Sequence, residues 1–193
     1  MRKVKWGILS TANIAQTQLI PAIQRAENAE VVAIASRGAK VHEVAQRLNI
    51  PHAYESYDEL LLDPEVEVIY IPLPNDMHKD WSIKAAEAGK HVLCEKPVVL
   101  AKEDLEEIIE VFSRHNKCFM EAFMYQFHPQ HQRVKDILMS GEIGEVRLFK
   151  SSHSFNFEDR EGDIRMDAGK GGGALWDLGC YSLHALQYFL DNR

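Results

Sequence analysis

The chain has 193 residues, of which 46% are apolar and 26% charged, an ordinary composition for a globular protein of one or two domains. The formal net charge of -7 argues against a nucleic-acid-binding surface. Three cysteines, Cys94, Cys118 and Cys180, show no CxxC spacing, which favours a reducing, cytoplasmic location. The sequence contains no apolar run of the length that a signal peptide or a membrane span requires, so we expect no membrane partner.

Short apolar runs alternate with amphipathic stretches over roughly the first 120 residues. The strand-like runs are KVKWGILS, EVVAIAS, VEVIYIPLP, HVLCE and KCFMEA. Strict alternation of this kind predicts parallel strands joined by right-handed crossovers, with helices on both faces. The pattern therefore predicts an α/β fold with a doubly wound parallel sheet of the Rossmann type, and we expect residues 1–122 to form a dinucleotide-binding domain.

The pattern changes after Phe123. It becomes a helix-like HPQHQRVKDILMSG, one long strand over residues 144–157, a glycine-rich loop and a helical ALWDLGCYSLHALQYFL. We expect residues 123–193 to form the beginning of an α+β substrate domain with an open sheet. A single strand cannot satisfy its own backbone donors and acceptors, so residues 124–193 are not expected to form a stable independent domain.

The carboxyl ends of the predicted strands should meet in one crevice, because ligands of doubly wound sheets bind there. The first of these ends reads STANIA and has small residues at Ser10, Ala12 and Ala15, where a dinucleotide fingerprint has glycine or alanine. A pyrophosphate could approach the following helix N-terminus, although an ordinary strand-to-helix turn explains these residues equally well. The predicted cofactor contacts here are Ser10, Thr11, Ala12, Asn13 and Ile14.

The second strand end reads ASRGAK and lacks the acidic residue that binds the ribose of NAD. The hydroxyl of Ser36 and the guanidinium of Arg37 suit a 2'-phosphate, and Lys40 adds positive charge. A solvated basic turn is the alternative interpretation. Within a doubly wound sheet this second strand end favours NADP, with NAD still possible.

Lys96 stands in the stretch CEKPV, between two apolar and β-branched segments. Lysine is seldom buried without a partner, and Pro97 keeps residue 96 out of a helical conformation. Lys96 therefore marks either a surface turn or an ammonium group placed at a strand end for chemistry. Glu95 could act as an acid there, but anchoring of the strand end is the simpler interpretation.

With these elements in place, the chain resembles the Gfo/Idh/MocA family of pyridine-nucleotide oxidoreductases. The resemblance is carried by CEKPV, PNDMH, EAFMYQFHPQ and DIRMDAGKGGGALWDLGCY, and it spans nearly the entire chain. It is strongest to the branch containing glucose-fructose oxidoreductase, NADP-dependent xylose dehydrogenase and trans-dihydrodiol dehydrogenase. Two departures stand out: Gln126 replaces a frequent arginine, and the family continues past Leu190 into an open, predominantly antiparallel sheet.

The resemblance implies that Lys96 lies beside the nicotinamide and that the Lys96-Pro97 peptide is cis. It also implies that Asp177 and Tyr181 point into the active site from the second domain. Further residues predicted near the cofactor are Pro72, Asn75, His78 and Glu95, and those predicted on the substrate side are Phe123, Gln126, His128, Asp177 and His184.

Asp177 and Tyr181 are four residues apart in a helical stretch, so they share one face, with His184 on the same side. Oxidation of a carbinol needs a base near the transferring carbon, and Tyr181 can be that base if the charge of Lys96 lowers its pKa. Asp177 would orient a neighbouring substrate hydroxyl. A satisfied aspartate beside a core tyrosine is the alternative, and we expect no metal because the histidines and cysteines lack a third ligand at a recognisable spacing.

These features predict an NADP-dependent dehydrogenase that acts on a sugar, a polyol or a cyclic diol, as a homo-oligomer formed through the sheet of the complete second domain. The alternative is a non-catalytic NADP-binding sensor or a truncated pseudoenzyme. On the first reading, we expect the 193-residue chain to bind NADP but to turn over sugars poorly or not at all.

Overall fold

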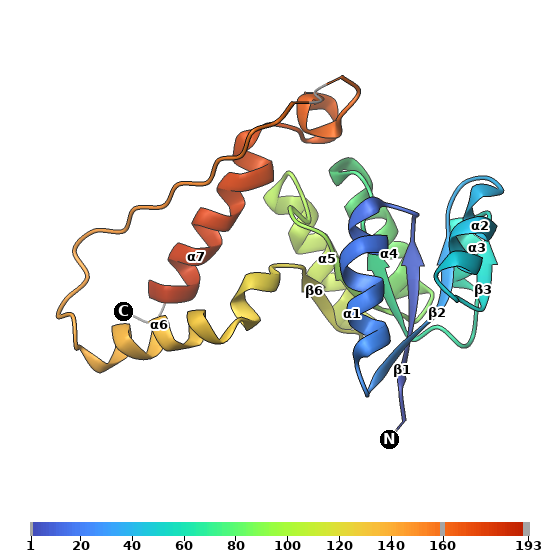
Figure 1. The fold of residues 1–193 in the computed structure, drawn as a ribbon, viewed down its shortest axis with the longest axis horizontal. Helices are drawn as coiled ribbons and strands as arrows, with labels where there is room; N and C mark the ends of the chain where they lie inside the picture. Colours follow the sequence, from blue (N-terminus) through green and yellow to red (C-terminus); the bar gives the residue numbers. More distant parts are fainter. Residues whose placement is uncertain (1, 159–160, 191–193) are drawn as a thin grey trace. The chain divides into compact units, whose positions relative to one another are not determined.

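The computed structural model describes residues 2–158 and 161–190, and the chain divides into two compact units, residues 1–121 and 122–193 (Figure 1). The first unit contains a six-stranded sheet. Its strands are β1 (Val4–Leu9), β2 (Ala29–Ala35), β3 (His52–Tyr54), β4 (Val68–Ile71), β5 (His91–Cys94) and β6 (Phe119–Glu121). All neighbouring pairs are parallel, in the order β3-β2-β1-β4-β5-β6, which confirms the predicted doubly wound sheet.

Helices cover both faces of this sheet. They are the π-helical turn η1 (Ala15–Leu19), α1 (Ile20–Arg25), α2 (Lys40–Arg47), α3 (Tyr57–Leu61), the 3-10 turn η2 (Asn75–Met77), α4 (His78–Glu87) and α5 (Lys102–Arg114). Apolar residues of α1 and α2 form one buried cluster with the sheet, and those of α3, α4 and α5 form a second. The strand order reverses between β1 and β4, so the crevice for a ligand is expected at the carboxyl ends of these two strands.

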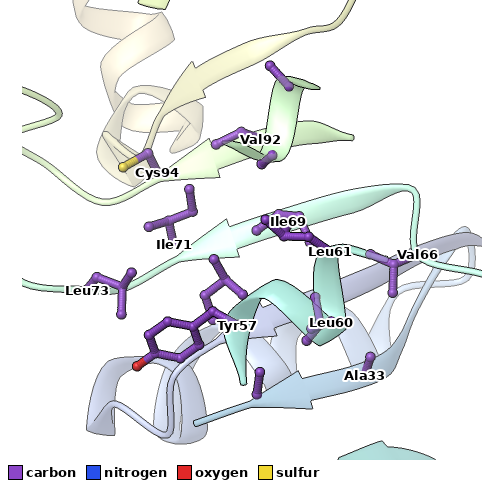
Figure 2. Packing of buried hydrophobic residues seen from close by; sticks show 14 of the residues in the cluster. Ala33, Tyr57, Leu60, Leu61, Val66, Ile69, Ile71, Leu73, Val92 and Cys94 are labelled. Carbon is purple, nitrogen blue, oxygen red and sulfur yellow. The ribbon is translucent and has the colours of Figure 1, made fainter. Parts of the chain in front are cut away.

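The second cluster shows why β1 contains a glycine. Leu60 and Leu61 of α3 pack against Ile69 on β4, with Val66 beside them (Figure 2). A Cβ added to Gly7 would lie 2.8 Å from Leu60 and 2.9 Å from Val66, closer than van der Waals contact allows. Gly7 therefore lets α3 pack closely against the first strand.

Helices and turns make up the regular structure that is described in the second unit. It contains the 3-10 turns η3 (Met124–Phe127), η4 (Ile164–Met166) and η5 (Ala168–Lys170), the helix α6 (Pro129–Ser140), the π-helical turn η6 (Leu175–Gly179) and α7 (Cys180–Leu190). Gly141 follows the last residue of α6, and its φ of 78° closes the helix with a left-handed residue. Within the described part of the chain, no helix combines the length and apolar character needed to cross a membrane.

The prediction of a long strand over residues 144–157 is wrong. This segment runs without helix or strand, and most of its side chains are exposed. A β-strand needs a neighbour to accept and donate its backbone hydrogen bonds, and none of the described residues pairs with this segment. The alternation of apolar and polar residues here favours a strand, but the described residues provide no neighbouring strand to pair with it.

Candidate functional site

The turn after β1 is closed by the side chain of Ser10. Its φ of 114° is a conformation that glycine adopts easily and serine rarely. The Ser10 hydroxyl accepts a hydrogen bond from the Ala12 amide at 3.0 Å and donates one to the Pro72 carbonyl at 3.5 Å. Serine thus stands in place of the first glycine of the fingerprint and adds two hydrogen bonds. The bond to Pro72 connects the ends of β1 and β4. The next helical turn begins at Asn13, soon after the end of β1.

The end of β2 lies next to this turn. The hydroxyls of Thr11 and Ser36 are 3.4 Å apart, within hydrogen-bonding distance. Arg37 and Lys40 are exposed, and residues 36–40 include no carboxylate. The structure therefore brings the predicted phosphate-binding residues of β1 and β2 together on one edge of the sheet.

The loop after β5 carries Lys96 at the same edge. The Lys96-Pro97 peptide is cis, as the resemblance implies. The Glu95 amide donates to the Ile71 carbonyl at 3.1 Å, which continues the ladder between β4 and β5 up to the loop. Lys96 itself is half-buried. The carboxyl ends of β1, β2, β4 and β5 are thus neighbours. That they line one crevice for a ligand stays a prediction.

His78 supports the Lys96 loop from behind. Its side chain is fully buried, and its two ring nitrogens lie 2.8 Å from the carbonyl oxygens of Pro97 and Leu73. Burial lowers the pKa of His78, against the opposing effect of the two carbonyl groups. Because the ring has no exposed surface, His78 joins the loops that follow β4 and β5 and does not itself face the crevice.

Two half-buried carboxyl groups flank the Lys96 loop. Glu95 accepts a hydrogen bond from the hydroxyl of Tyr70 at 2.5 Å, and Glu121 accepts one from the Val98 amide at 2.9 Å. Burial raises the pKa of both carboxyl groups, and the positive charge of Lys96 acts in the opposite direction on each. Glu121 is the first residue of the EAFMYQFHPQ segment, but the sequence interpretation did not assign it to the site, because a glutamate at the end of a three-residue strand has no distinctive pattern. Only the sheet register, which pairs it with Cys94, shows its position.

In the second unit, Phe123 lies at the centre of an aromatic cluster. It stacks on His184 with ring centroids 4.1 Å apart and meets the edge of Tyr181 at 5.4 Å. The hydroxyl of Tyr125 is 2.5 Å from Nδ1 of His184, and burial lowers the pKa of this histidine. Phe123 is therefore in contact with two other predicted residues, Tyr181 and His184.

Asp177 belongs to a different set of contacts in the same unit. Its carboxylate accepts a hydrogen bond from Nε of Arg165 at 3.1 Å, and Arg165 also pairs with Asp163 at 3.1 Å. A Cβ on Gly172 would lie 2.6 to 2.7 Å from three backbone carbonyls of residues 164, 165 and 167. Gly172 is therefore required by the fold of its own loop.

The other predicted substrate-side residues have structural contacts. His128 is exposed and caps α6 by accepting a hydrogen bond from the Gln130 amide at 3.1 Å. The backbone carbonyl of Gln126 accepts the Tyr188 hydroxyl at 3.5 Å. Among the residues that the structure describes, no group of three or more His, Cys, Asp or Glu side chains is arranged to hold a metal ion.

Family models match both parts of the chain. A model described as the oxidoreductase family with an NAD-binding Rossmann fold matches residues 4–123, and the GFO/IDH/MocA C-terminal domain matches residues 131–193. The chain belongs to the GFO/IDH/MocA oxidoreductase family. The family resemblance carried by the CEKPV and GGGAL segments is confirmed.

Named relatives support the same assignment. The chain is 43% identical to D-xylose 1-dehydrogenase (NADP(+)) 2 of Haloferax volcanii over 96% of its length and 57% of that protein. It is 35% identical to trans-1,2-dihydrobenzene-1,2-diol dehydrogenase of Xenopus tropicalis, over 92% of the chain and 54% of that protein. A solved structure of KijD10, a 3-ketoreductase from Actinomadura kijaniata in complex with NADP and TDP-benzene, is 37% identical with a TM-score of 0.92.

The match to KijD10 covers 98% of this chain and 58% of that structure. The chain thus spans somewhat more than half the length of these GFO/IDH/MocA relatives.

Proposed function

We propose that this chain binds NADP through its first unit and belongs to a dehydrogenase that acts on a sugar, a polyol or a cyclic diol. The observation that carries the proposal is the position of Lys96, at the end of β5 beside the ends of β1 and β4. Three relatives named for dehydrogenation or ketone reduction of sugars and diols support the substrate class. The two units are proposed to serve as the cofactor domain and part of the substrate domain.

The residues at the sheet edge fit a dinucleotide. The small side chains of the Ser10–Ala12 turn and the helix beginning at Asn13 leave room for a pyrophosphate against backbone amides. Arg37 and Lys40 provide exposed positive charge where a 2'-phosphate would lie, and an acidic side chain that would repel it is absent from residues 36–40. The NADP named in the xylose dehydrogenase and in the KijD10 complex supports this choice over NAD.

The cofactor would supply or accept the hydride, and the chain supplies charge and a proton carrier. Lys96 is proposed to hold its ammonium group beside the reacting oxygen, where a positive charge stabilises developing negative charge. Tyr181 is proposed to move the proton of the substrate hydroxyl, and Asp177 to orient a neighbouring hydroxyl. Phe123 stacks on His184 and also packs against Tyr181. Its contact with Tyr181 holds the tyrosine ring in position.

Turnover of K96A and Y181F, each introduced into a protein that carries a complete substrate domain, tests the catalytic assignment. Each substitution is expected to lower kcat by about a hundredfold or more, since general acid-base groups typically contribute factors of 10² to 10⁴. NADP affinity should change by less than about tenfold, because both residues are assigned to chemistry. The exposed Lys102→Ala serves as a control with the same loss of charge. A K96A or Y181F protein with turnover close to wild type contradicts the assigned role.

Assembly and location are also proposals. Cys94 and Cys118 are free thiols, which suits a reducing compartment such as the cytoplasm. A homo-oligomer is proposed as the working form, and sedimentation of the purified protein at several concentrations tests it.

A further inference from the structure

Glu121 lies where the sheet meets the Lys96 loop. It is the last residue of β6 and is paired in register with Cys94, the last residue of β5. From there its carboxylate reaches past the cis peptide and accepts the Val98 amide at 2.9 Å. The β5–β6 ladder has ended at this point, so the side chain of Glu121 provides a hydrogen bond that the backbone of β6 no longer supplies to the loop.

The charged and titratable groups around Lys96 come from four elements. Glu95 follows β5, Glu121 ends β6, His78 begins α4, and Tyr70 on β4 donates to Glu95. The charge of Lys96 lowers the pKa of Glu95 and of Glu121 against the opposing effect of burial.

We propose that Glu121 is a positioning residue for Lys96: it fixes the backbone of the loop through the Val98 amide and supplies a counter-charge to the ammonium group. This assignment rests on the proposed function only in that Lys96 is taken to be a catalytic residue. It uses a strand-end carboxylate that stands first in the EAFMYQFHPQ segment but was not among the predicted site residues.

A carboxyl group that only accepts the Val98 amide, with no effect on Lys96, would make the same hydrogen bond, so the charge and the hydrogen bond need separate variants. E121Q keeps a carbonyl oxygen for the Val98 amide but removes the negative charge. E121A removes both. E110Q, at an exposed position of α5, is the matched control for loss of a glutamate charge.

Hydrogen exchange of the Val98 amide in the 193-residue chain tests the hydrogen bond. We expect exchange in E121A to be about ten- to a hundredfold faster than in wild type, because a bond to a charged acceptor contributes about 1.5–3 kcal/mol. E121Q should be slower than E121A, and E110Q should match wild type. Val98 exchange that is equally slow in E121A and in wild type overturns this half of the proposal.

Titration of the Glu121 carboxyl group by carbon-13 NMR tests the charge coupling. In K96M the pKa of Glu121 should rise by about half a unit or more, since a neighbouring positive charge that lowers it has been removed. The Glu110 carboxyl group, on an exposed face, should titrate as in wild type. A Glu121 pKa that is unchanged or lower in K96M overturns the coupling.

Neither measurement requires turnover. The titration in K96M also does not require E121A to fold. If K96A kept its activity, the catalytic assignment would fail while the coupling of Glu121 to Lys96 would stand. If the Glu121 pKa were the same in K96M as in wild type while K96A lost turnover, the positioning role would fail and the catalytic assignment would stand.

Discussion

The two units differ in how they use their apolar side chains. Within the described residues, every buried hydrophobic side chain lies in residues 1–121 except Phe123. The second unit instead leaves many large apolar side chains more than half exposed: Met124, Phe127, Met139, Ile143, Leu148, Phe155, Met166, Leu175 and Leu183. In the first unit, the described large apolar side chains that are more than half exposed are Leu62 and Ile109.

This difference follows from the secondary structure of each unit. In the first, six paired strands satisfy their backbone groups internally, and helices cover the sheet on both faces. In the second, α6 and α7 have apolar faces but no described sheet to pack on, and residues 145–158 have no strand partner. The first unit carries its own hydrophobic core, whereas the second needs additional buried surface to be equally stable.

The largest expected effect is in backbone amide exchange. In the 193-residue chain, central amides of β1, β2 and β4 should exchange at least about a thousandfold more slowly than amides of residues 145–190, because exchange from a cooperative core requires global unfolding. Exchange followed by mass spectrometry at fixed pH measures both units in one sample. Strong protection throughout residues 145–190 in a monodisperse monomer would break the comparison.

Two glycine substitutions sharpen the comparison. In G7A, the new Cβ would lie within 2.9 Å of Leu60 and Val66 in the core of the first unit. We expect a loss of about 1–3 kcal/mol in the free energy of unfolding, the usual range for overpacking. In G172A, the new Cβ meets backbone carbonyls of residues 164–167, so the loop should rearrange.

Thermal and urea unfolding read by circular dichroism measure the two variants. G7A should lower the main transition, and G172A should leave that transition near wild type while changing exchange of residues 163–173. An equal loss of stability in both variants would show that the two units unfold together.

Acid sensitivity provides a smaller effect, specific to the first unit. Burial of Asp63 would raise its pKa, but hydrogen bonds from His52, the Glu65 amide and Tyr54 outweigh burial and lower it. A carboxyl group with a lowered folded pKa binds protons more readily when unfolded, so its stabilisation is present above about pH 4 and is lost as the pH falls through the folded pKa.

D63N should therefore be less stable than wild type at pH 7, with a shallower decline between about pH 4 and pH 2. The slopes can differ by at most one proton, about 1.4 kcal/mol per pH unit. Glu95 and Glu121, whose pKa values burial raises, act in the opposite sense, so the difference between the two proteins is the quantity to measure. Parallel stability curves for D63N and wild type would contradict the role of Asp63.

The sequence predicts the first unit well because its patterns are local. Alternating strand and helix periods give the parallel sheet, but the three-residue strand β3 (His52–Tyr54) was missed because it is too short to show a period. The strand expected over residues 144–157 was wrong for the opposite reason. Its pattern is suitable, but pairing depends on a partner that local sequence cannot specify.

The candidate site likewise contains some positions that the sequence predicts and others that it does not. Positions set by strand ends, such as Ser10, Ser36 and Lys96, follow from the fold, and the structure brings them to one edge. The supporting contacts do not follow: Glu121 reaches Val98 across strands, Arg165 binds Asp177 across twelve residues, and His78 is buried between two loops. Each depends on three-dimensional register, which residue type and spacing alone do not give.

Calorimetric titration of the chain with NADP and NAD tests the central claim, that the first unit is an NADP site. We expect NADP to bind at least about tenfold more tightly than NAD, corresponding to about 1.4 kcal/mol from charge-assisted contacts to the 2'-phosphate. R37D should erase or reverse this preference, whereas R25D, which makes the same charge change at the far end of α1, should retain it. Equal wild-type affinities for the two cofactors, or an unchanged preference in R37D, would contradict the account.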